Sequence, residues 1–281
     1  MISGTKPRLL SILNTAAFLI NASETFGFGP FSSHFSGYEF SPEQVEKWQT
    51  IVHPSLFSFV IWAVIFLMQA IFCYVCNVKG EEYSAHPLVV DGISYYYLLA
   101  CLAQTLWSPA FGYEHMYLAA ACMGGVLISL TIIAIKQNEA RKNAMEGNPQ
   151  IELAFGGKYY WLLQFTFELY LGWVMTTFLL SVNVIFIAEQ ASSSVQVVVA
   201  ALSLLMLAAA SLRYLYQEVP IYTIPSVTIW TTFWICFELH NPAALILDTF
   251  SSSEIKIICY ESIGLFFVLT YCCVWKKLLS F

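Results

Sequence analysis

The sequence predicts an all-α integral membrane protein, a polytopic transmembrane helix bundle with about eight spans. Of its 281 residues, 58% are hydrophobic and 11% are charged, whereas soluble domains contain about 25% charged residues. The apolar residues form continuous blocks of about 20, the length that crosses a bilayer core of about 30 Å as a helix. Continuous blocks favour helices over the alternating pattern of a membrane β-barrel.

Eight apolar blocks give the predicted spans. They lie at residues 9–22, 55–76, 92–111, 116–135, 159–188, 195–212, 219–237 and 257–275. The first block is short for a full crossing. Because Lys6 and Arg8 precede it and the small pair Ala22-Ser23 ends it, it also fits a cleaved signal peptide. A retained helix is our preferred interpretation.

The basic residues indicate the orientation of these spans. When the loops are assigned alternately to two sides, ten of the twelve Lys and Arg residues fall on one side and only Lys47 and Lys256 fall on the other. This asymmetry is the one that the positive-inside rule describes. We therefore expect both termini on the cytoplasmic or equivalent side, in a membrane that the sequence does not identify. The ten residues are Lys6, Arg8, Lys79, Lys136, Arg141, Lys142, Lys158, Arg213, Lys276 and Lys277.

Several classes of function find no support in the sequence. A net charge of −6 is not the basic footprint of a nucleic-acid-binding protein. The eight cysteines lie mostly in apolar runs, where cysteine behaves as a small hydrophobic residue. The five histidines form no metal-spaced pair, and the chain has no phosphate loop and no nucleophile elbow. Nothing in the sequence requires an enzyme, although a membrane enzyme acting on a lipid stays open.

One charged residue lies well inside a predicted span. Glu168 is flanked on both sides by apolar sequence, and charges within a membrane are costly and so require an explanation. It is either a functional carboxylate, which takes a proton or accepts from a ligand amine or pyrrole, or a carboxyl group that is protonated or paired with a neighbouring helix.

Large aromatic residues share helix faces with hydrogen-bonding residues in four of the predicted spans. Residues three, four and seven apart lie on one face of a helix. The four stripes are Phe59, Trp62, Phe66 and Gln69; Gln104, Trp107 and Phe111; Tyr170, Trp173 and Thr177; and Trp230, Trp234 and Glu238. Each stripe alone is typical of helix packing. If several converge, they form an aromatic cavity, the usual lining for a flat apolar ligand.

Three motifs resemble one known family. The run Pro54-Ser55-Leu56-Phe57-Ser58-Phe59-Val60-Ile61-Trp62 resembles the second-helix signature of the TspO/MBR family, the tryptophan-rich sensory and translocator proteins. Gln104-Thr105-Leu106-Trp107-Ser108-Pro109-Ala110-Phe111 is similar to its third-helix N-x-x-W-S-x-x-F. Glu168-Leu169-Tyr170-Leu171-Gly172-Trp173 is similar to its fifth-helix P-Y-x-x-W. The chain departs from these patterns at Gln104, which replaces Asn, and at Glu168, which stands where the family has proline.

The resemblance implies a long, multi-span relative of that family. Residues 1–190 would form a TspO-like five-helix core, with three further transmembrane helices in residues 191–281. Five-helix members of the family bind flat hydrophobic ligands within the bundle and are described as sensors, carriers or regulators. The expected ligand-binding residues are Phe59, Trp62, Phe66, Gln104, Trp107, Phe111, Glu168, Tyr170 and Trp173.

The resemblance and the stripes together predict a binding or carrier protein, with a sensory or receptor role, for a porphyrin, sterol or pigment-like ligand. The expected partners are the bilayer, the apolar ligand, and either a second copy of the chain or a membrane complex. Two alternatives stay open. The chain could be a structural subunit of a larger membrane complex, in which the stripes are packing surfaces. It could also be a secondary transporter with Glu168 as its proton site.

Overall fold

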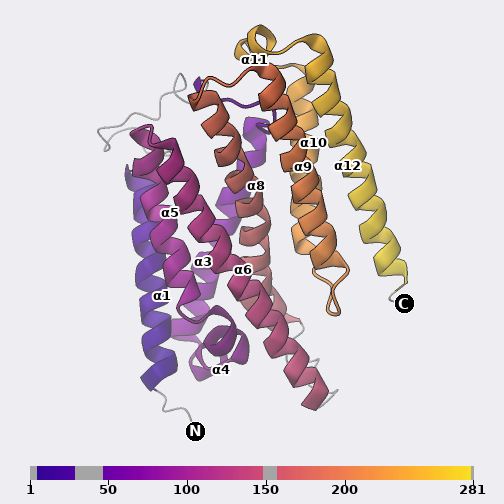
Figure 1. The fold of residues 1–281 in the computed structure, drawn as a ribbon. Helices are drawn as coiled ribbons and strands as arrows, with labels where there is room; N and C mark the ends of the chain where they lie inside the picture. The colour runs from indigo at the N-terminus through magenta and orange to yellow at the C-terminus, as the bar shows by residue number, and fades with distance from the viewer. Residues whose placement is uncertain (1–4, 29–46, 148–156, 280–281) are drawn as a thin grey trace.

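The computed structural model describes residues 5–28, 47–147 and 157–279, and within these ranges the regular elements are helices. Eight long helices stand side by side (Figure 1). They are α1 (Thr5–Ser23), α3 (Val60–Val78), α5 (Tyr96–Gly112), α6 (Met116–Gly147), α8 (Phe165–Ala188), α9 (Ser193–Leu215), α10 (Thr223–His240) and α12 (Ser252–Leu278). Each corresponds to one of the eight predicted spans, so the all-α bundle predicted from the sequence is confirmed.

Short elements extend or connect the long helices. The π-helical turns are η1 (Glu24–Phe28), η3 (Leu88–Ile93) and η5 (Tyr160–Gln164), the 3-10 turn is η2 (Leu56–Phe59), and the short α-helices are α4 (Glu81–Ser84) and α11 (Ala244–Thr249). Since η1 continues α1 directly, the first helical segment is longer than its apolar block predicted.

Six helical segments of the described residues are long and apolar enough to cross a membrane. They are Pro7–Phe26, Leu56–Val78, Met116–Asn143, Tyr160–Ala188, Ser193–Leu215 and Ser252–Leu278. The predicted third and seventh spans, α5 and α10, are the two that are not among them. At 17 and 18 residues, these helices are about 25 and 27 Å long at 1.5 Å per residue. The chain is an integral membrane protein of several spans.

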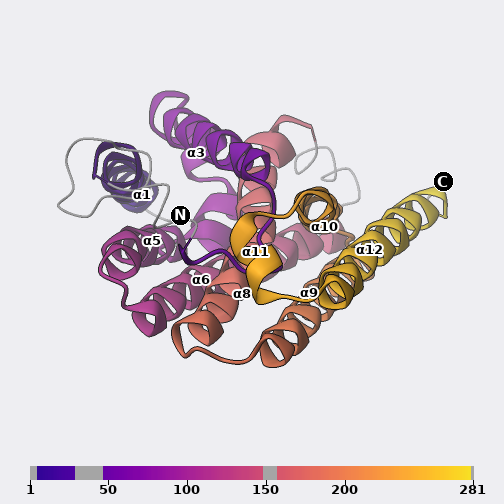
Figure 2. The ribbon, with the colours of Figure 1, turned by 90° about the horizontal axis from the view of Figure 1, so that it is seen from above.

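The helix α8 forms the centre of the bundle (Figure 2). Every residue from Thr166 to Thr176 is buried, which is typical of a helix surrounded by others on all sides. Its apolar residues belong to a core cluster that also contains Leu207 of α9 and Val227 of α10. Helices before and after residue 190 therefore share one core. The predicted division at that residue stays a prediction.

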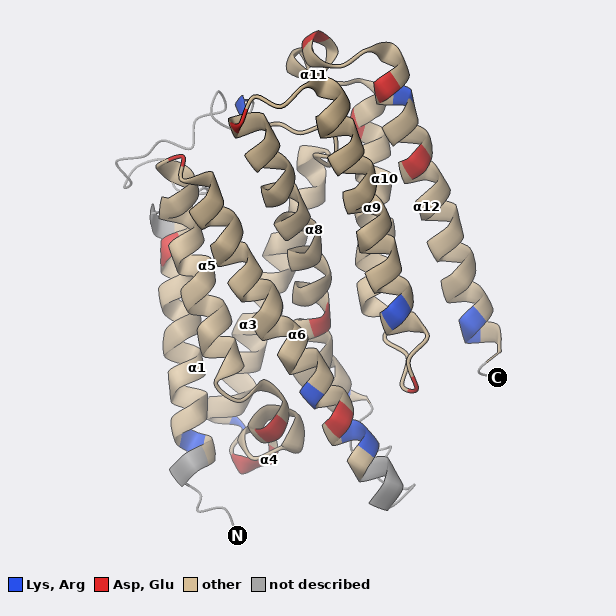
Figure 3. Ribbon diagram, in the orientation of Figure 1, with Lys and Arg blue, Asp and Glu red and all other residues tan. Residues whose placement is uncertain are grey.

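Charged residues lie near the two ends of the bundle. Figure 3 shows Lys and Arg mainly at the lower end of the helices, where both ends of the chain also lie. The long middle parts of the helices carry few charges, as a membrane-crossing bundle requires. We call the end at which α8 finishes and α9 begins the upper end of the bundle.

Candidate functional site

A buried glutamine joins three helices inside the bundle. The side-chain Oε1 of Gln104 in α5 accepts hydrogen bonds from Asn21 Nδ2 of α1, at 3.2 Å, and from the hydroxyl of Tyr170 in α8. Asn21 and Tyr170 are fully buried and Gln104 is 5% exposed. We call these three residues the Gln104 node. Because the bilayer core offers no water as a partner, polar side chains of membrane helices commonly bond across to one another.

Aromatic side chains of η2 and α3 lie against α8 next to the Gln104 node. The ring of Trp62 is 6.1 Å from that of Tyr170 and 6.4 Å from that of Trp173, and both pairs are edge-to-face. Phe59 meets Trp173 at 5.4 Å, also edge-to-face. These separations and angles are the ones that aromatic pairs prefer. The predicted stripes of the second and fifth spans therefore face each other.

The same stripe of α3 also reaches α1. The ring centroid of Phe66 lies 6.0 Å from that of Trp62 on its own helix. It lies 6.3 Å from the ring centroid of Phe18 in α1 and 4.9 Å from that of Phe26 in η1. The contacts thus run from α1 to α3, α8 and α5 and back to α1. We call the set the ring site; it consists of Asn21, Phe59, Trp62, Phe66, Gln104, Tyr170 and Trp173.

Trp107 lies at the edge of the ring site. It is partly buried and, like Trp62, packs against the core cluster that contains Trp173. Trp107 also stacks on Phe111, with ring centroids 5.4 Å apart. Phe111 in turn packs against a separate cluster of Trp48, Met116 and Val184. Phe111 therefore continues the ring site toward the upper end of the bundle.

Two of these indoles have a buried donor without an acceptor. Among the described residues, neither Trp107 Nε1 nor Trp173 Nε1 has a hydrogen-bond partner, and both nitrogens are buried. By contrast, Trp230 Nε1 of α10 donates to the carbonyl of Ser58 at 3.2 Å. Buried polar groups almost always have partners, so the two unpaired N–H groups require an explanation.

Glu168 lies apart from the ring site in its hydrogen bonding. Its carboxylate accepts from Thr223 Oγ1 at 2.6 Å, Gln164 Nε2 at 2.8 Å and the Tyr160 hydroxyl at 3.1 Å. Thr223 begins α10, so the carboxylate connects α8 and η5 to that helix. Three donors satisfy a buried carboxylate well, and this arrangement stabilises the contact between the helices.

A histidine outside the spans lies against the ring site. His53 stacks on Phe59, with ring centroids 5.3 Å apart, and its Nδ1 donates to the carbonyl of Pro54 at 3.1 Å. Burial lowers the pKa of His53 to about 4, although the hydrogen bond to Pro54 acts in the opposite direction. The imidazole beside Phe59 is therefore neutral at pH 7.

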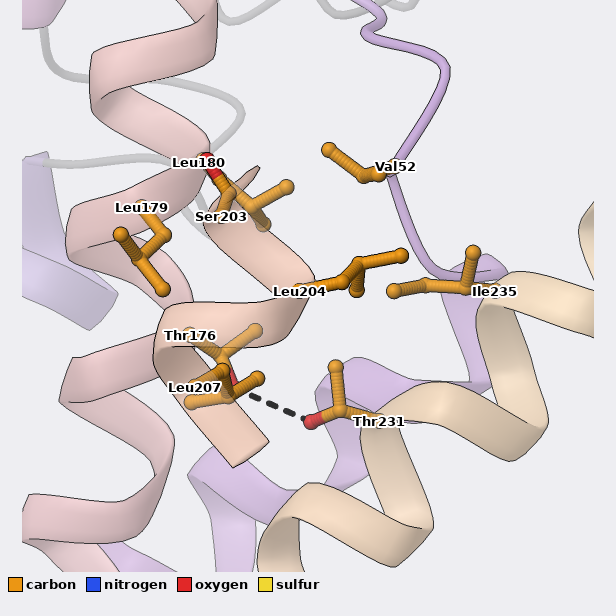
Figure 4. A pocket seen from close by; sticks show the side chains of 9 residues that line it. All are labelled: Val52, Thr176, Leu179, Leu180, Ser203, Leu204, Leu207, Thr231 and Ile235. Carbon is orange, nitrogen blue, oxygen red and sulfur yellow. Dashed lines mark hydrogen bonds between the residues drawn. The ribbon is translucent and has the colours of Figure 1, made fainter. Parts of the chain in front are cut away.

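A cavity lies elsewhere, between α8, α9 and α10 (Figure 4). It is lined mainly by aliphatic side chains such as Leu180, Leu204 and Ile235. Thr176 and Thr231 form a hydrogen bond of 3.1 Å across one side. Its free space holds about one water molecule, so we interpret this cavity as a packing gap. None of the predicted site residues lines it.

The sequence did not predict Asn21 as a site residue. A usable signal is present: Ser11, Asn14 and Asn21 are polar, lie in an apolar block and are spaced by three and seven, so they share one helix face. All three are buried. Within the described residues, His, Cys, Asp and Glu form no group of three that could hold a metal ion.

Comparison with known proteins supports the family resemblance. The sequence model of the family described as TSPO-like protein matches residues 13–272, which include all or most of each long helix. No curated protein and no solved structure gives a significant match. The match extends over more than half of the chain and through the helices that form the ring site. This membrane protein therefore belongs to the TSPO-like protein family.

Proposed function

We propose that the protein binds a flat hydrophobic ligand at the ring site, within the membrane, and carries or senses it. The observation that carries this proposal is the pair of unpaired, buried indole N–H groups of Trp107 and Trp173 among aromatic rings. A ligand oxygen or nitrogen would accept from them. Apolar pockets with a few convergent polar groups are typical of small-molecule sites.

The exposure of the rings suggests how such a ligand enters. Trp173 and Tyr170 are fully buried, whereas Phe59, Trp62 and Trp107 are partly exposed. The rings of Phe59 and Trp62 both contact that of Trp173. A ligand would therefore displace the more exposed rings and lie against the buried ones. Tetrapyrroles, sterols and pigments have the flat apolar surface that this requires.

Tryptophan fluorescence tests the proposal. Protoporphyrin added to the purified protein in detergent should quench the fluorescence at micromolar concentration. The apparent Kd should weaken about tenfold in Trp107→Ala, because an aromatic contact contributes about 1.4 kcal/mol, which is a factor of ten. The matched control is Trp275→Phe, which removes an exposed indole of α12 that stacks on Tyr271. The control variant should bind as tightly as the wild type.

Two results would count against the proposal. One is the absence of quenching at micromolar protoporphyrin. The other is an equal Kd in the wild type and Trp107→Ala, which would place the porphyrin outside the ring site. The protein could instead co-purify with a stoichiometric protein partner and fail to bind porphyrin. That result would favour the alternative of a structural subunit.

A further inference from the structure

Three polar side chains lie at one level of the bundle. The helices α1, α5 and α8 run in the same direction, from the lower to the upper end (Figure 1), and η1 continues α1. In each of these helical segments, the residue three positions after a member of the Gln104 node is polar: Glu24 after Asn21, Trp107 after Gln104 and Trp173 after Tyr170. Three positions are about one helical turn. These three residues therefore form a layer directly above the node.

The carboxylate in this layer is unusual. The Glu24 side chain is half buried, and both of its oxygens are buried. Among the described residues, the donor beside the carboxylate is the hydroxyl of Ser108 in α5. No salt bridge found in the described part of the chain includes Glu24.

A carboxylate in this position can accept further hydrogen bonds, because its two oxygens have about four acceptor sites and Ser108 supplies one donor. Burying a charge without a partner costs much more free energy than burying a neutral polar group. The indole N–H groups of Trp107 and Trp173 do not donate to this carboxylate and have no partner among the described residues. A flat molecule between the two kinds of group would donate to the carboxylate from an N–H group and accept from the indoles at the face of its ring, as a weak N–H···π hydrogen bond.

We infer that Glu24 is a further ligand-binding residue, and that the ligand of the ring site is a flat apolar molecule with a basic nitrogen. An ammonium or protonated ring nitrogen would donate to the Glu24 carboxylate while the ring system lies against Trp62 and Trp173. The inference rests on the proposed function, and it defines which flat ligands the site prefers.

Two matched probes test the inference. Pyrenemethylamine and pyrenemethanol share one flat ring and differ in the charged nitrogen, and both accept excitation energy from tryptophan. In vesicles of neutral phosphatidylcholine, the amine should bind at least about tenfold more tightly, because a hydrogen bond to a charged group contributes that much. In Glu24→Gln, this preference should disappear while pyrenemethanol binds as before. The control Glu189→Gln removes a carboxylate that bonds to Tyr117 at the surface and should keep the preference.

Each other outcome has a defined meaning. Equal binding of the two probes by the wild type would overturn the inference and leave the proposed function standing, and this comparison needs no variant to fold. A preference for the amine that persists in Glu24→Gln would also overturn the inference. If neither probe binds the wild type, the proposed function fails as well.

Discussion

Gln104 is the residue on which the geometry of the ring site depends most. A single side-chain oxygen accepts from two fully buried donors on two other helices. Removing the acceptor leaves both donors unpaired, and each unpaired buried group costs about 1–3 kcal/mol. Removing one donor costs less free energy, because Gln104 still accepts a hydrogen bond from the other donor.

A double-mutant cycle measures this dependence. Gln104→Leu should lower the free energy of unfolding by about 2–4 kcal/mol, and Tyr170→Phe by about 1 kcal/mol. The double variant should lose less than the sum, because Tyr170→Phe removes one of the donors that Gln104→Leu leaves unpaired. Thermal or denaturant unfolding in detergent gives the three values. Additivity to within about 0.5 kcal/mol would show that the two residues do not interact.

His53 predicts how stability depends on pH. Its folded-state pKa is about 4, below the ordinary value of 6.5, so the folded state binds fewer protons than the unfolded state between these values. The contribution of the neutral His53 to the free energy of unfolding is fully present above pH 6.5 and is lost as the pH falls toward 4. The Tm of the wild type should therefore decrease more between pH 7 and pH 4.5 than that of His53→Gln. Equal decreases in the two proteins would refute this assignment.

The sequence allowed part of the ring site to be predicted. Helical spacing predicts that Trp62 lies with Phe59 and Phe66 on one helix face, and that Tyr170 lies with Trp173 on another, because residues that share a face can be identified from local sequence. The apolar block of the first span ends at residue 22, so the sequence predicts that Glu24 lies outside the helix. The π-helical turn η1 instead continues α1 and brings the carboxylate above Asn21.

At the scale of the elements, the close approach of α8 and α10 depends on a glycine. A Cβ added at Gly172 of α8 would lie 2.9 Å from Cβ and 3.1 Å from Cγ2 of Val227 in α10. Together with the Glu168–Thr223 hydrogen bond, this contact joins the predicted five-helix core to the last three helices. Helices approach closely in membranes where one of them carries a small residue.

Two glycine substitutions should therefore have opposite effects. Gly172→Ala should decrease the free energy of unfolding by about 1–3 kcal/mol, because the added methyl group overpacks the interface with Val227. Gly264→Ala, in the interior of α12, meets no atom within 4 Å and should increase stability by up to about 1 kcal/mol, since alanine favours the helix. Unfolding in detergent compares the two variants. A Gly172→Ala variant as stable as the wild type would contradict the contact.

At the scale of the whole molecule, both ends of the described chain lie at the lower end of the bundle (Figure 1). The ten-to-two distribution of basic residues predicts that this end faces the cytoplasm or its equivalent. Epitope tags fused to each terminus should both react in cells whose plasma membrane alone is permeabilised. A tag that reacts only after internal membranes are opened, or on intact cells, would overturn this orientation.

The number of long helices could be predicted, because each apolar block forms one helix. The order in which the helices pack could not, since neighbours in the bundle are often distant in sequence. The contacts Asn21–Gln104 and Trp62–Trp173 join residues 83 and 111 positions apart. Only the folded arrangement shows that α1, α3, α5 and α8 surround one site.

Photoaffinity labelling tests the central claim most directly, that a flat apolar ligand binds between these four helices. The membrane-embedded protein would be illuminated with a porphyrin that carries a diazirine group, and the labelled peptides would then be identified. We predict that the label is concentrated on peptides from α1, α3, α5 and α8 and that unlabelled porphyrin displaces it. Label distributed mainly over the exposed faces of α9 and α12, without displacement, would contradict the account.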